Sequence, residues 1–252
     1  MFNHFLTTKD LGNFDTRSIS LDNFSIKLSE ALDNQIDSDY SSIFVPSLNH
    51  TTNIVDSSYP DSFNWLSASV FKSSELADGI VISKGEVAGI TLADCLAVCV
   101  YDENRLSLLH VNFRTLIPKD PSISNIIDSL FEKEIFNPQN VSAWIGAGIG
   151  SCCFGAEHYA EIGNDINTIS SELTPHISMA TEGPRKGQIS IDLRSLADFF
   201  LRKNEVRSSK IKIDDECTSC AKIQNQQKYW SHTIAKSNGL LDGRNLFLTW
   251  LT

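Results

Sequence analysis

One stretch of the chain, residues 89–114, constrains the fold more than any other. Residues 89–101 form a nearly unbroken apolar run that contains a single acid, and residues 102–105 are polar and turn-like. Residues 106–111 are apolar again. Two short β-prone runs around a polar turn predict an antiparallel hairpin.

The predicted hairpin brings one cysteine and one histidine together. A two-residue turn pairs Asp102 with Arg105. The same register places Cys95 opposite Asn112 and on the same face as His110. A thiol and an imidazole on one face favour either a metal half-site or a nucleophile–base pair. A buried cysteine beside a satisfied core histidine is the alternative, and it is the more frequent outcome for such a pair alone.

Predicted strands and helices alternate along the rest of the chain, which favours one mixed α/β domain over residues 1–252. Asp94 points to the opposite face from Cys95, which favours a structural role for its carboxylate. A long polar loop at residues 174–188 is a candidate lid or binding loop. Helices are predicted at residues 22–32, 157–173 and 194–203, and another is capped by Ser122 or Ser124 and ended by Asn137 and Pro138. Strands are predicted at residues 43–45, 77–83, 141–145, 189–193 and 210–213.

Composition limits the classes of partner. The chain has 252 residues, of which 41% are hydrophobic, and this is enough for a sizeable core. Its formal net charge of −10 argues against nucleic acid or an anionic membrane as the main partner. No apolar run is long enough to cross a membrane, and the N-terminus has no secretory pattern. We therefore expect a cytoplasmic protein with reduced thiols; its oligomeric state is not predicted.

The remaining cysteines form two short motifs. Cys217 and Cys220 make a C-x-x-C, which alone is half of a structural zinc site. No second C-x-x-C or H-x-H completes it, so no structural zinc is predicted there. A thioredoxin-type redox role is a minor alternative, because the motif follows a predicted strand. The adjacent Cys152 and Cys153 are expected to be two inert buried thiols.

Short motifs spread over residues 50–245 resemble the YfiH/YlmD family, also called the laccase-domain or FAMIN-like family. His50 lies in a counterpart of the family's Q-V-H-G segment, Cys95 in its T-A-D-C motif, and His110 in its H-A-G-W-R-G motif. No single match is strong, but their shared order along the chain is hard to produce by chance. The other matching segments are residues 77–79, 145–153, 192–193, 217–218, 230–233 and 243–244.

The resemblance implies a layered α/β sandwich with mixed sheets and a metal site made by His50, Cys95 and His110. Two nitrogens and one thiolate leave a fourth tetrahedral position open, as in catalytic zinc sites. Zinc is the expected metal, and copper is the alternative, because the same ligands suit it. We expect the ligand atoms of the three side chains to converge within about 4 Å of one another.

The resemblance also implies an activity. The family is associated with purine nucleoside phosphorylase, adenosine deaminase and methylthioadenosine phosphorylase activities, and also with polyphenol oxidation. The chain has only six histidines, too few for the His clusters of a multicopper oxidase, so purine nucleoside chemistry ranks first. The expected partners are therefore a purine nucleoside and phosphate.

Expected roles follow from these positions. A metal-activated water of pKa about 7 would attack purine carbon six in a deamination. In a phosphorolysis, Arg114 and Arg244 are the expected phosphate clamp. Cys95, His110 and Arg114 are thus the predicted catalytic residues. Asn112, Arg114 and Arg244 are the predicted substrate-binding residues.

The chain departs from the family pattern beside these positions. Asn112 replaces a glycine and is predicted to project into the pocket. Thr233 replaces an arginine after Ser231 and His232. These changes support a catalytically degenerate metal-binding relative as one alternative. A Cys–His hydrolase, with Cys95 as nucleophile and His110 as base, or a cell-wall-precursor editing factor is another.

Overall fold

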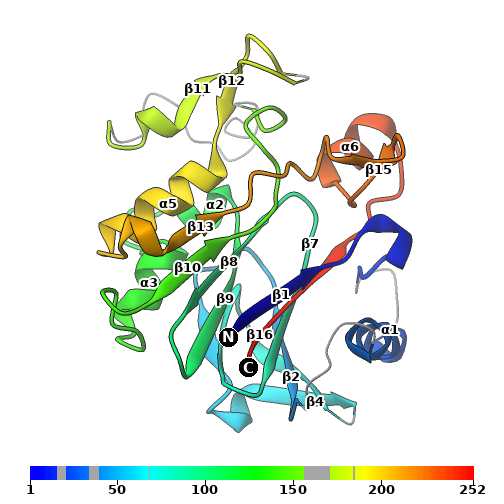
Figure 1. The fold of residues 1–252 in the computed structure, drawn as a ribbon, viewed down its shortest axis with the longest axis vertical. Coiled ribbons are helices and arrows are strands. Elements are labelled where there is room, and N and C mark those ends of the chain that lie inside the picture. Colours follow the sequence, from blue (N-terminus) through cyan, green and yellow to red (C-terminus); the bar gives the residue numbers. More distant parts are fainter. Residues whose placement is uncertain (16–20, 34–39, 68, 156–170, 184) are drawn as a thin grey trace.

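Two six-stranded sheets form the centre of the protein and pack face to face (Figure 1). The computed structural model describes residues 1–252 apart from 16–20, 34–39, 68, 156–170 and 184. The first sheet has the order β1-β16-β7-β2-β5-β4, and the second has the order β13-β10-β8-β9-β6-β3. Both sheets mix parallel and antiparallel pairs, which agrees with the predicted mixed α/β class.

The strands of the first sheet are β1 (Phe2–Leu6), β2 (Ile43–Ser47), β4 (Phe63–Ser67), β5 (Val70–Leu76), β7 (Val87–Leu92) and β16 (Asn245–Leu251). Those of the second are β3 (Ile54–Asp56), β6 (Gly79–Ser83), β8 (Leu96–Tyr101), β9 (Arg105–Val111), β10 (Ser142–Ile145) and β13 (Ile211–Ile213). Two small hairpins pair β11 (Ile177–Met179) with β12 (Ile189–Ile191), and β14 (Lys222–Ile223) with β15 (Gln226–Gln227). The helices are α1 (Leu21–Asp33), α2 (Phe113–Leu116), α3 (Ile126–Glu132), α5 (Leu193–Lys203) and α6 (His232–Asn238).

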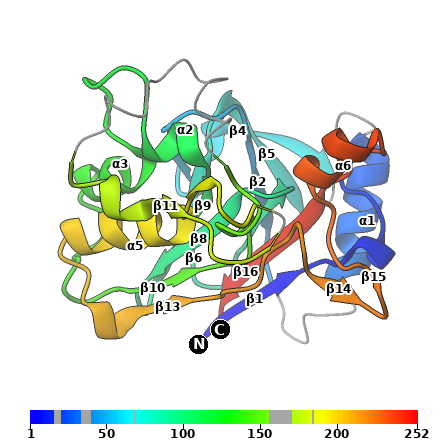
Figure 2. The ribbon, with the colours of Figure 1, turned by 90° about the horizontal axis from the view of Figure 1, so that it is seen from above.

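Alternation along the central strands produces separate apolar layers. In β8, Ala97 and Cys99 pack between the two sheets, whereas Val98 and Val100 pack against the helices on the far side. On the first sheet, Phe24 of α1 packs against the outer face of β2 and its neighbours. Helices α2, α3 and α5 cover the outer face of the second sheet (Figure 2). The resulting helix–sheet–sheet–helix order confirms the predicted layered α/β sandwich.

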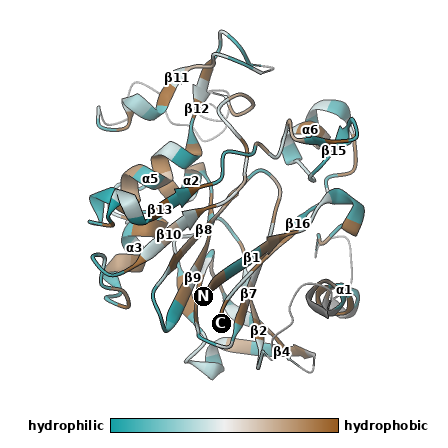
Figure 3. Cartoon of the chain, viewed as in Figure 1, coloured by the Kyte–Doolittle hydropathy of each residue, from teal (hydrophilic) through white to brown (hydrophobic). Residues whose placement is uncertain are grey.

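Apolar residues make up most of these layers. Figure 3 shows apolar stretches along the central strands and polar stretches in many of the loops. In the described part of the chain, no helix is both long and apolar enough to cross a membrane.

The predicted hairpin register is confirmed, but the first apolar run is two strands. β8 pairs with β9 so that Leu96 faces Val111 and Tyr101 faces Leu106, which is the register of a turn closed by Asp102. The chain leaves β7 and enters β8 through Asp94, which has a positive φ of 79°. Aspartate tolerates this conformation better than most residues, and the bend moves the chain from one sheet to the other.

Other boundaries differ from the sequence predictions for identifiable reasons. Helix α3 starts at Ile126 because the Asn125 side chain accepts hydrogen bonds from the main-chain N–H groups of Ile127 and Asp128, both at 3.0 Å. Strand β2 continues through Pro46 to Ser47, two residues beyond its predicted end at residue 45. Residues 174–188 contain strand β11 and are not a structureless loop. The predicted helix at 157–173 falls largely outside the described residues.

The two cysteine motifs also depart from expectation. Cys217 and Cys220 lie in a turn that leads to β14, not at a helix N-terminus, so the thioredoxin-like placement is wrong. No second C-x-x-C accompanies them in the sequence, but the fold brings the adjacent Cys152 and Cys153 beside them. One ligand atom from each of Cys152, Cys153, Cys217 and Cys220 lies within 4.8 Å of the others.

Candidate metal centre

The hairpin positions the first two predicted ligands. Cys95 directly precedes β8, and His110 lies near the end of β9, where it pairs with Ala97. Directly opposed residues in an antiparallel pair point to the same face, and so do residues two apart on one strand. The Cys95 thiol and the His110 ring therefore meet on the face predicted from the sequence.

The third predicted ligand comes from a different loop. His50 follows β2 and has a positive φ of 55°, which is uncommon for a non-glycine residue. Its ring centroid lies 5.7 Å from that of His110, with the planes inclined by 26°. One ligand atom from each of His50, Cys95 and His110 lies within 4.8 Å of the other two. The three side chains thus converge, within a slightly wider limit than the predicted separation of about 4 Å.

Asp78 holds the His110 ring and the loop that carries His50. Its Oδ1 lies 2.6 Å from Nδ1 of His110, and its carboxylate is buried. Its Oδ2 accepts hydrogen bonds from the main-chain N–H groups of Asn49 at 3.0 Å and Thr51 at 2.8 Å, which flank His50. The main-chain N–H of His110 donates to the Asp78 carbonyl at 2.7 Å. One buried carboxylate therefore fixes the His110 ring and the His50 loop.

Asp78 lies in one of the segments that match the family, residues 77–79, but the sequence indicates no role for its carboxylate. The available signal was an acid directly before an apolar strand, a place where a carboxylate has to be paired or hydrogen-bonded.

The electrostatics favour a thiolate at Cys95. Burial raises the pKa of the Cys95 thiol, but His110 and His50 outweigh burial and lower the pKa to about 6. Burial lowers the pKa of His110, but Cys95 and Asp78 outweigh it and raise the pKa to about 10. Without a metal, Cys95 and His110 therefore form a thiolate–imidazolium pair near neutral pH.

The donor set fits a zinc ion. Because Nδ1 of His110 is bonded to Asp78, Nε2 is the nitrogen left to face Cys95. A carboxylate behind a ligating imidazole is the usual outer partner of a zinc-bound histidine. Two imidazoles and one thiolate are three protein ligands, which is the number found in catalytic zinc sites.

The three side chains lie in the wall of a cavity of about 620 Å³. Leu48, Leu66 and Leu76 contribute apolar surface to it, and Lys72 and Arg244 contribute positive charge. This volume lies within the range of small-molecule sites. The cavity therefore combines a candidate metal centre with apolar and cationic surfaces.

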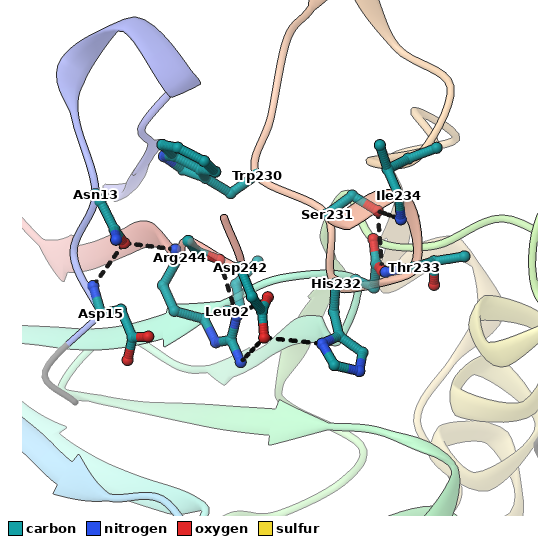
Figure 4. Close-up of polar contacts among 12 residues, drawn as sticks. Asn13, Asp15, Leu92, Trp230, Ser231, His232, Thr233, Ile234, Asp242 and Arg244 are labelled. Carbon is teal, nitrogen blue, oxygen red and sulfur yellow. Dashed lines mark hydrogen bonds and ion pairs between the residues drawn. The ribbon is translucent and has the colours of Figure 1, made fainter. Parts of the chain in front are cut away.

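Arg244 is held at this cavity by an acid (Figure 4). Asp242 accepts a hydrogen bond from Nη1 of Arg244 at 2.5 Å, and its other oxygen lies 3.0 Å from Nδ1 of His232. The hydrogen bonds from Arg244 and His232 outweigh burial and lower the pKa of Asp242. Arg244 and His232 both line the cavity.

Two predicted substrate-binding residues lie elsewhere. The Asn112 side chain does not enter the cavity: its Oδ1 accepts hydrogen bonds from the main-chain N–H groups of Arg114 at 2.8 Å and Thr115 at 3.2 Å. The strand ends at Val111, so alternation no longer applies and Asn112 caps α2. Arg114 is exposed on α2 and is not among the residues that line the cavity, whereas Arg244 is.

Asp94 has the structural role expected of it. Its buried carboxylate accepts hydrogen bonds from the hydroxyls of Thr218 at 2.9 Å, Ser219 at 3.2 Å and Ser231 at 3.0 Å. It also accepts one from the main-chain N–H of Thr233 at 2.8 Å. Asp94 thus joins the turn before Cys95 to two later segments of the chain.

Comparisons with known proteins agree with this architecture. The Bacillus licheniformis hypothetical protein YfiH is 18% identical, with a TM-score of 0.72 over 100% of this chain and 93% of that one. YlmD from Geobacillus stearothermophilus is 19% identical, with a TM-score of 0.71 over 99% and 92% of the two chains. A Neisseria meningitidis protein of the DUF152 family is 17% identical, with a TM-score of 0.68 over 99% and 94%. At these identities the likeness establishes the fold alone.

A sequence-family match covers most of the chain. No curated protein matches the chain. The family described as multi-copper polyphenol oxidoreductase laccase matches residues 26–252. The same fold is found in YfiH and YlmD, the proteins from which the sequence resemblance takes its name. The chain therefore belongs to the YfiH/YlmD family of laccase-domain proteins.

Proposed function

We propose that the protein is a zinc-dependent enzyme that acts on purine nucleosides. The reaction is phosphorolysis of adenosine, inosine or methylthioadenosine, deamination of adenosine, or both. The observation that carries this proposal is the convergence of His50, Cys95 and His110 in the wall of a nucleoside-sized cavity. Three ligands leave one zinc position for a water or substrate atom.

Three side chains would bind the metal, and a fourth orients one of these ligands and holds the loop that carries another. His50, Cys95 and His110 would hold the ion, and the ion would supply a Lewis acid that activates water or polarises the substrate. Asp78 accepts a hydrogen bond from Nδ1 of His110 and so keeps Nε2 available as a ligand. Its bonds to Asn49 and Thr51 fix the loop that carries His50.

The cavity wall supports the choice of substrate. Its leucines offer apolar surface for a base, and Arg244 can donate charge-assisted hydrogen bonds to phosphate. Lys72 adds a second cation on the same wall. In the absence of Arg114 from this wall, Lys72 and Arg244 are the proposed phosphate partners.

The test is a direct assay of purified, zinc-loaded protein with adenosine, inosine or methylthioadenosine. Reactions run with and without phosphate, and the products are separated by chromatography. Phosphorolysis releases a free base only when phosphate is present, whereas deamination converts adenosine to inosine without phosphate. Turnover should disappear in Cys95→Ser and persist in His4→Gln, a control because His4 is exposed on β1. Absence of turnover with every nucleoside, in protein shown to hold zinc, would contradict the proposal.

A Cys–His hydrolase is the second candidate, and Asp78 favours it specifically. The acid, imidazole and thiol stand in the order Asp78, His110, Cys95. Asp78 orients the His110 ring, and the pKa of the Cys95 thiol is about 6. Iodoacetamide separates the two candidates. A thiolate nucleophile that works without metal should be alkylated at once, whereas a zinc-bound Cys95 should be protected until a chelator removes the ion.

Polyphenol oxidation by several coppers ranks third. In the described residues, His50 and His110 belong to the only candidate metal group that contains histidine. The other candidate group consists of four cysteines. A single histidine-containing group supports one metal at the cavity, which suits the nucleoside chemistry better.

A further inference from the structure

Four of the six cysteines gather in a second group, away from the cavity wall. Cys152 and Cys153 follow the glycine-rich turn after β10, and Cys217 and Cys220 lie in the turn before β14. Cys153 and Cys217 are buried, Cys152 is half-buried, and Cys220 is exposed. One side of the group therefore reaches solvent, which gives a metal ion a way in.

Two of the sulfur–sulfur distances in this group are close to the edge length of a zinc tetrahedron. The Cys152 sulfur lies 3.7 Å from that of Cys153 and 3.6 Å from that of Cys220. All four sulfurs lie within 4.8 Å of one another. Four thiolates around zinc at Zn–S distances of about 2.3 Å are about 3.8 Å apart. These separations are far longer than the roughly 2.0 Å of a disulfide.

The backbone around the group is already fixed. The main-chain N–H of Gly150 donates to the Cys217 sulfur at 3.2 Å, a bond that a thiolate accepts better than a thiol. Gly148 and Cys217 form a parallel bridge, and the Thr218 N–H donates to the Gly148 carbonyl at 3.0 Å. The two cysteine-bearing turns are thus joined by hydrogen bonds that do not depend on a metal.

A buried cation lies beside the sulfurs. Arg194 is 9% exposed, and one of its Nη2 bonds reaches the Gly148 carbonyl at 2.7 Å. A side chain placed at Gly150 would meet Nη1 of Arg194 at 3.4 Å and the Cys152 sulfur at 3.2 Å, so both groups flank the same glycine. Zn²⁺ with four thiolates keeps two excess negative charges, and a neighbouring guanidinium offsets part of them.

We propose that Cys152, Cys153, Cys217 and Cys220 bind one zinc ion in a closed structural site. Each thiol loses its proton to become a thiolate ligand, and no oxidant is needed. Four sulfur ligands fill the tetrahedron, so this site has no open position for substrate. It is separate from the centre at His50, Cys95 and His110 and does not depend on the proposed nucleoside chemistry.

The site braces the cavity wall through Asp94. Thr218 and Ser219, which lie between Cys217 and Cys220, donate their hydroxyls to the Asp94 carboxylate. The main-chain N–H of Ile149 donates to the Asp94 carbonyl at 2.8 Å. Both cysteine-bearing turns therefore hold the residue that precedes Cys95.

The test uses the Cys95→Ser protein, in which the first centre has lost its thiolate. The protein is purified under reducing conditions, exposed to zinc, dialysed free of loose metal, and examined by elemental analysis and zinc X-ray absorption. The expected result is roughly one zinc per chain with four sulfur neighbours at about 2.3 Å. Folded Cys95→Ser protein without bound zinc, or with mixed nitrogen and sulfur neighbours, would overturn the proposal.

Two further variants assign the ligands. Adding Cys220→Ser to Cys95→Ser should remove the zinc, because Cys220 is an exposed member of the group and is easily replaced. Adding Cys99→Ala instead should leave it, since Cys99 lies in the core between the sheets and outside both groups. Circular dichroism checks that each variant is folded. Peptide mapping that finds a Cys152–Cys220 disulfide in freshly purified protein would also overturn the proposal.

Discussion

The two ligand groups differ in where their side chains come from and in how much of the metal they would enclose. Cys95 and His110 are supplied by a buried hairpin, and their partner His50 is held by Asp78. The four cysteines come instead from two irregular turns near the surface. Three ligands beside a cavity leave a position for chemistry, whereas four ligands without one serve stability. The comparison teaches that ligand count and surroundings together separate a reactive site from a structural one.

The largest effect is expected from Cys95→Ser. Loss of the thiolate should remove most of the zinc from the first centre and lower nucleoside turnover by more than about 100-fold, beyond the usual effect of an outer partner. Zinc content and initial rate are measured on the same preparation. Unchanged turnover in Cys95→Ser would show that the centre at His50, Cys95 and His110 is not the reactive one.

Asp78→Asn should weaken the first centre without removing a ligand. Nδ1 of His110 and the His50 loop both lose a carboxylate, so zinc affinity should fall by about 10–100-fold. Competition with a chromophoric chelator measures the affinity. Asp61→Asn is the matched control, because Asp61 is exposed and lies outside the site. Equal affinities in the two variants would show that Asp78 does not orient the ligands.

Arg244→Ala should separate substrate binding from metal binding. Loss of a charge-assisted hydrogen bond of about 1.5–3 kcal/mol predicts a rise in the KM for phosphate of roughly 10–100-fold, with zinc content unchanged. Arg114→Ala is the control, since Arg114 is exposed and lies outside the cavity lining. A larger rise in the KM for phosphate in Arg114→Ala than in Arg244→Ala would show that Arg114, as predicted from the sequence, binds the phosphate.

Cys220→Ser should affect stability more than turnover. If the lost ligand costs about 2–3 kcal/mol, Tm falls by roughly 4–12 °C for a chain of this size. The first centre should keep its zinc. Differential scanning calorimetry with and without added zinc measures the change, and an unchanged Tm in both conditions would leave the cysteine group without a structural role.

The smallest effect is a shift in the pH dependence of Cys95 alkylation in chelator-treated protein. The pKa of Cys95 is about 6, so the thiolate is present above that pH and is lost as the pH falls through it. Half-maximal alkylation should therefore occur near pH 6, compared with about 8.5 for a free cysteine. Peptide mass spectrometry follows Cys95 alone, and a midpoint near 8.5 would refute the thiolate–imidazolium pair.

The sequence predicted local geometry better than long-range assembly. Strand alternation was enough to place Cys95 and His110 together, because both lie on one hairpin with a fixed turn. The same rule failed for Asn112, one residue beyond the strand end, where helix capping takes over. The start of α3 was predicted a few residues too early, because serine and asparagine have similar propensities to cap a helix and Asn125, not Ser122 or Ser124, is the cap.

The contacts that sequence reasoning missed join distant segments. Asp78 contacts the loop that carries His50 and His110 on strand β9, and neither partner can be deduced from the residues next to it in the sequence. The same holds for Cys152 and Cys217, which lie on separate turns that only the folded sheets bring together. His50 was placed by family resemblance, because its spacing from Cys95 follows no local rule.

Zinc X-ray absorption on the Cys152→Ser/Cys220→Ser protein tests the central claim most directly. This variant lacks two thiolates of the cysteine group, so the remaining bound zinc reports on the centre at His50, Cys95 and His110. The account predicts roughly one zinc per chain with two nitrogen neighbours at about 2.0–2.1 Å, one sulfur at about 2.3 Å and one further light atom. Folded protein with no zinc, or with zinc bound to sulfur alone, would contradict it.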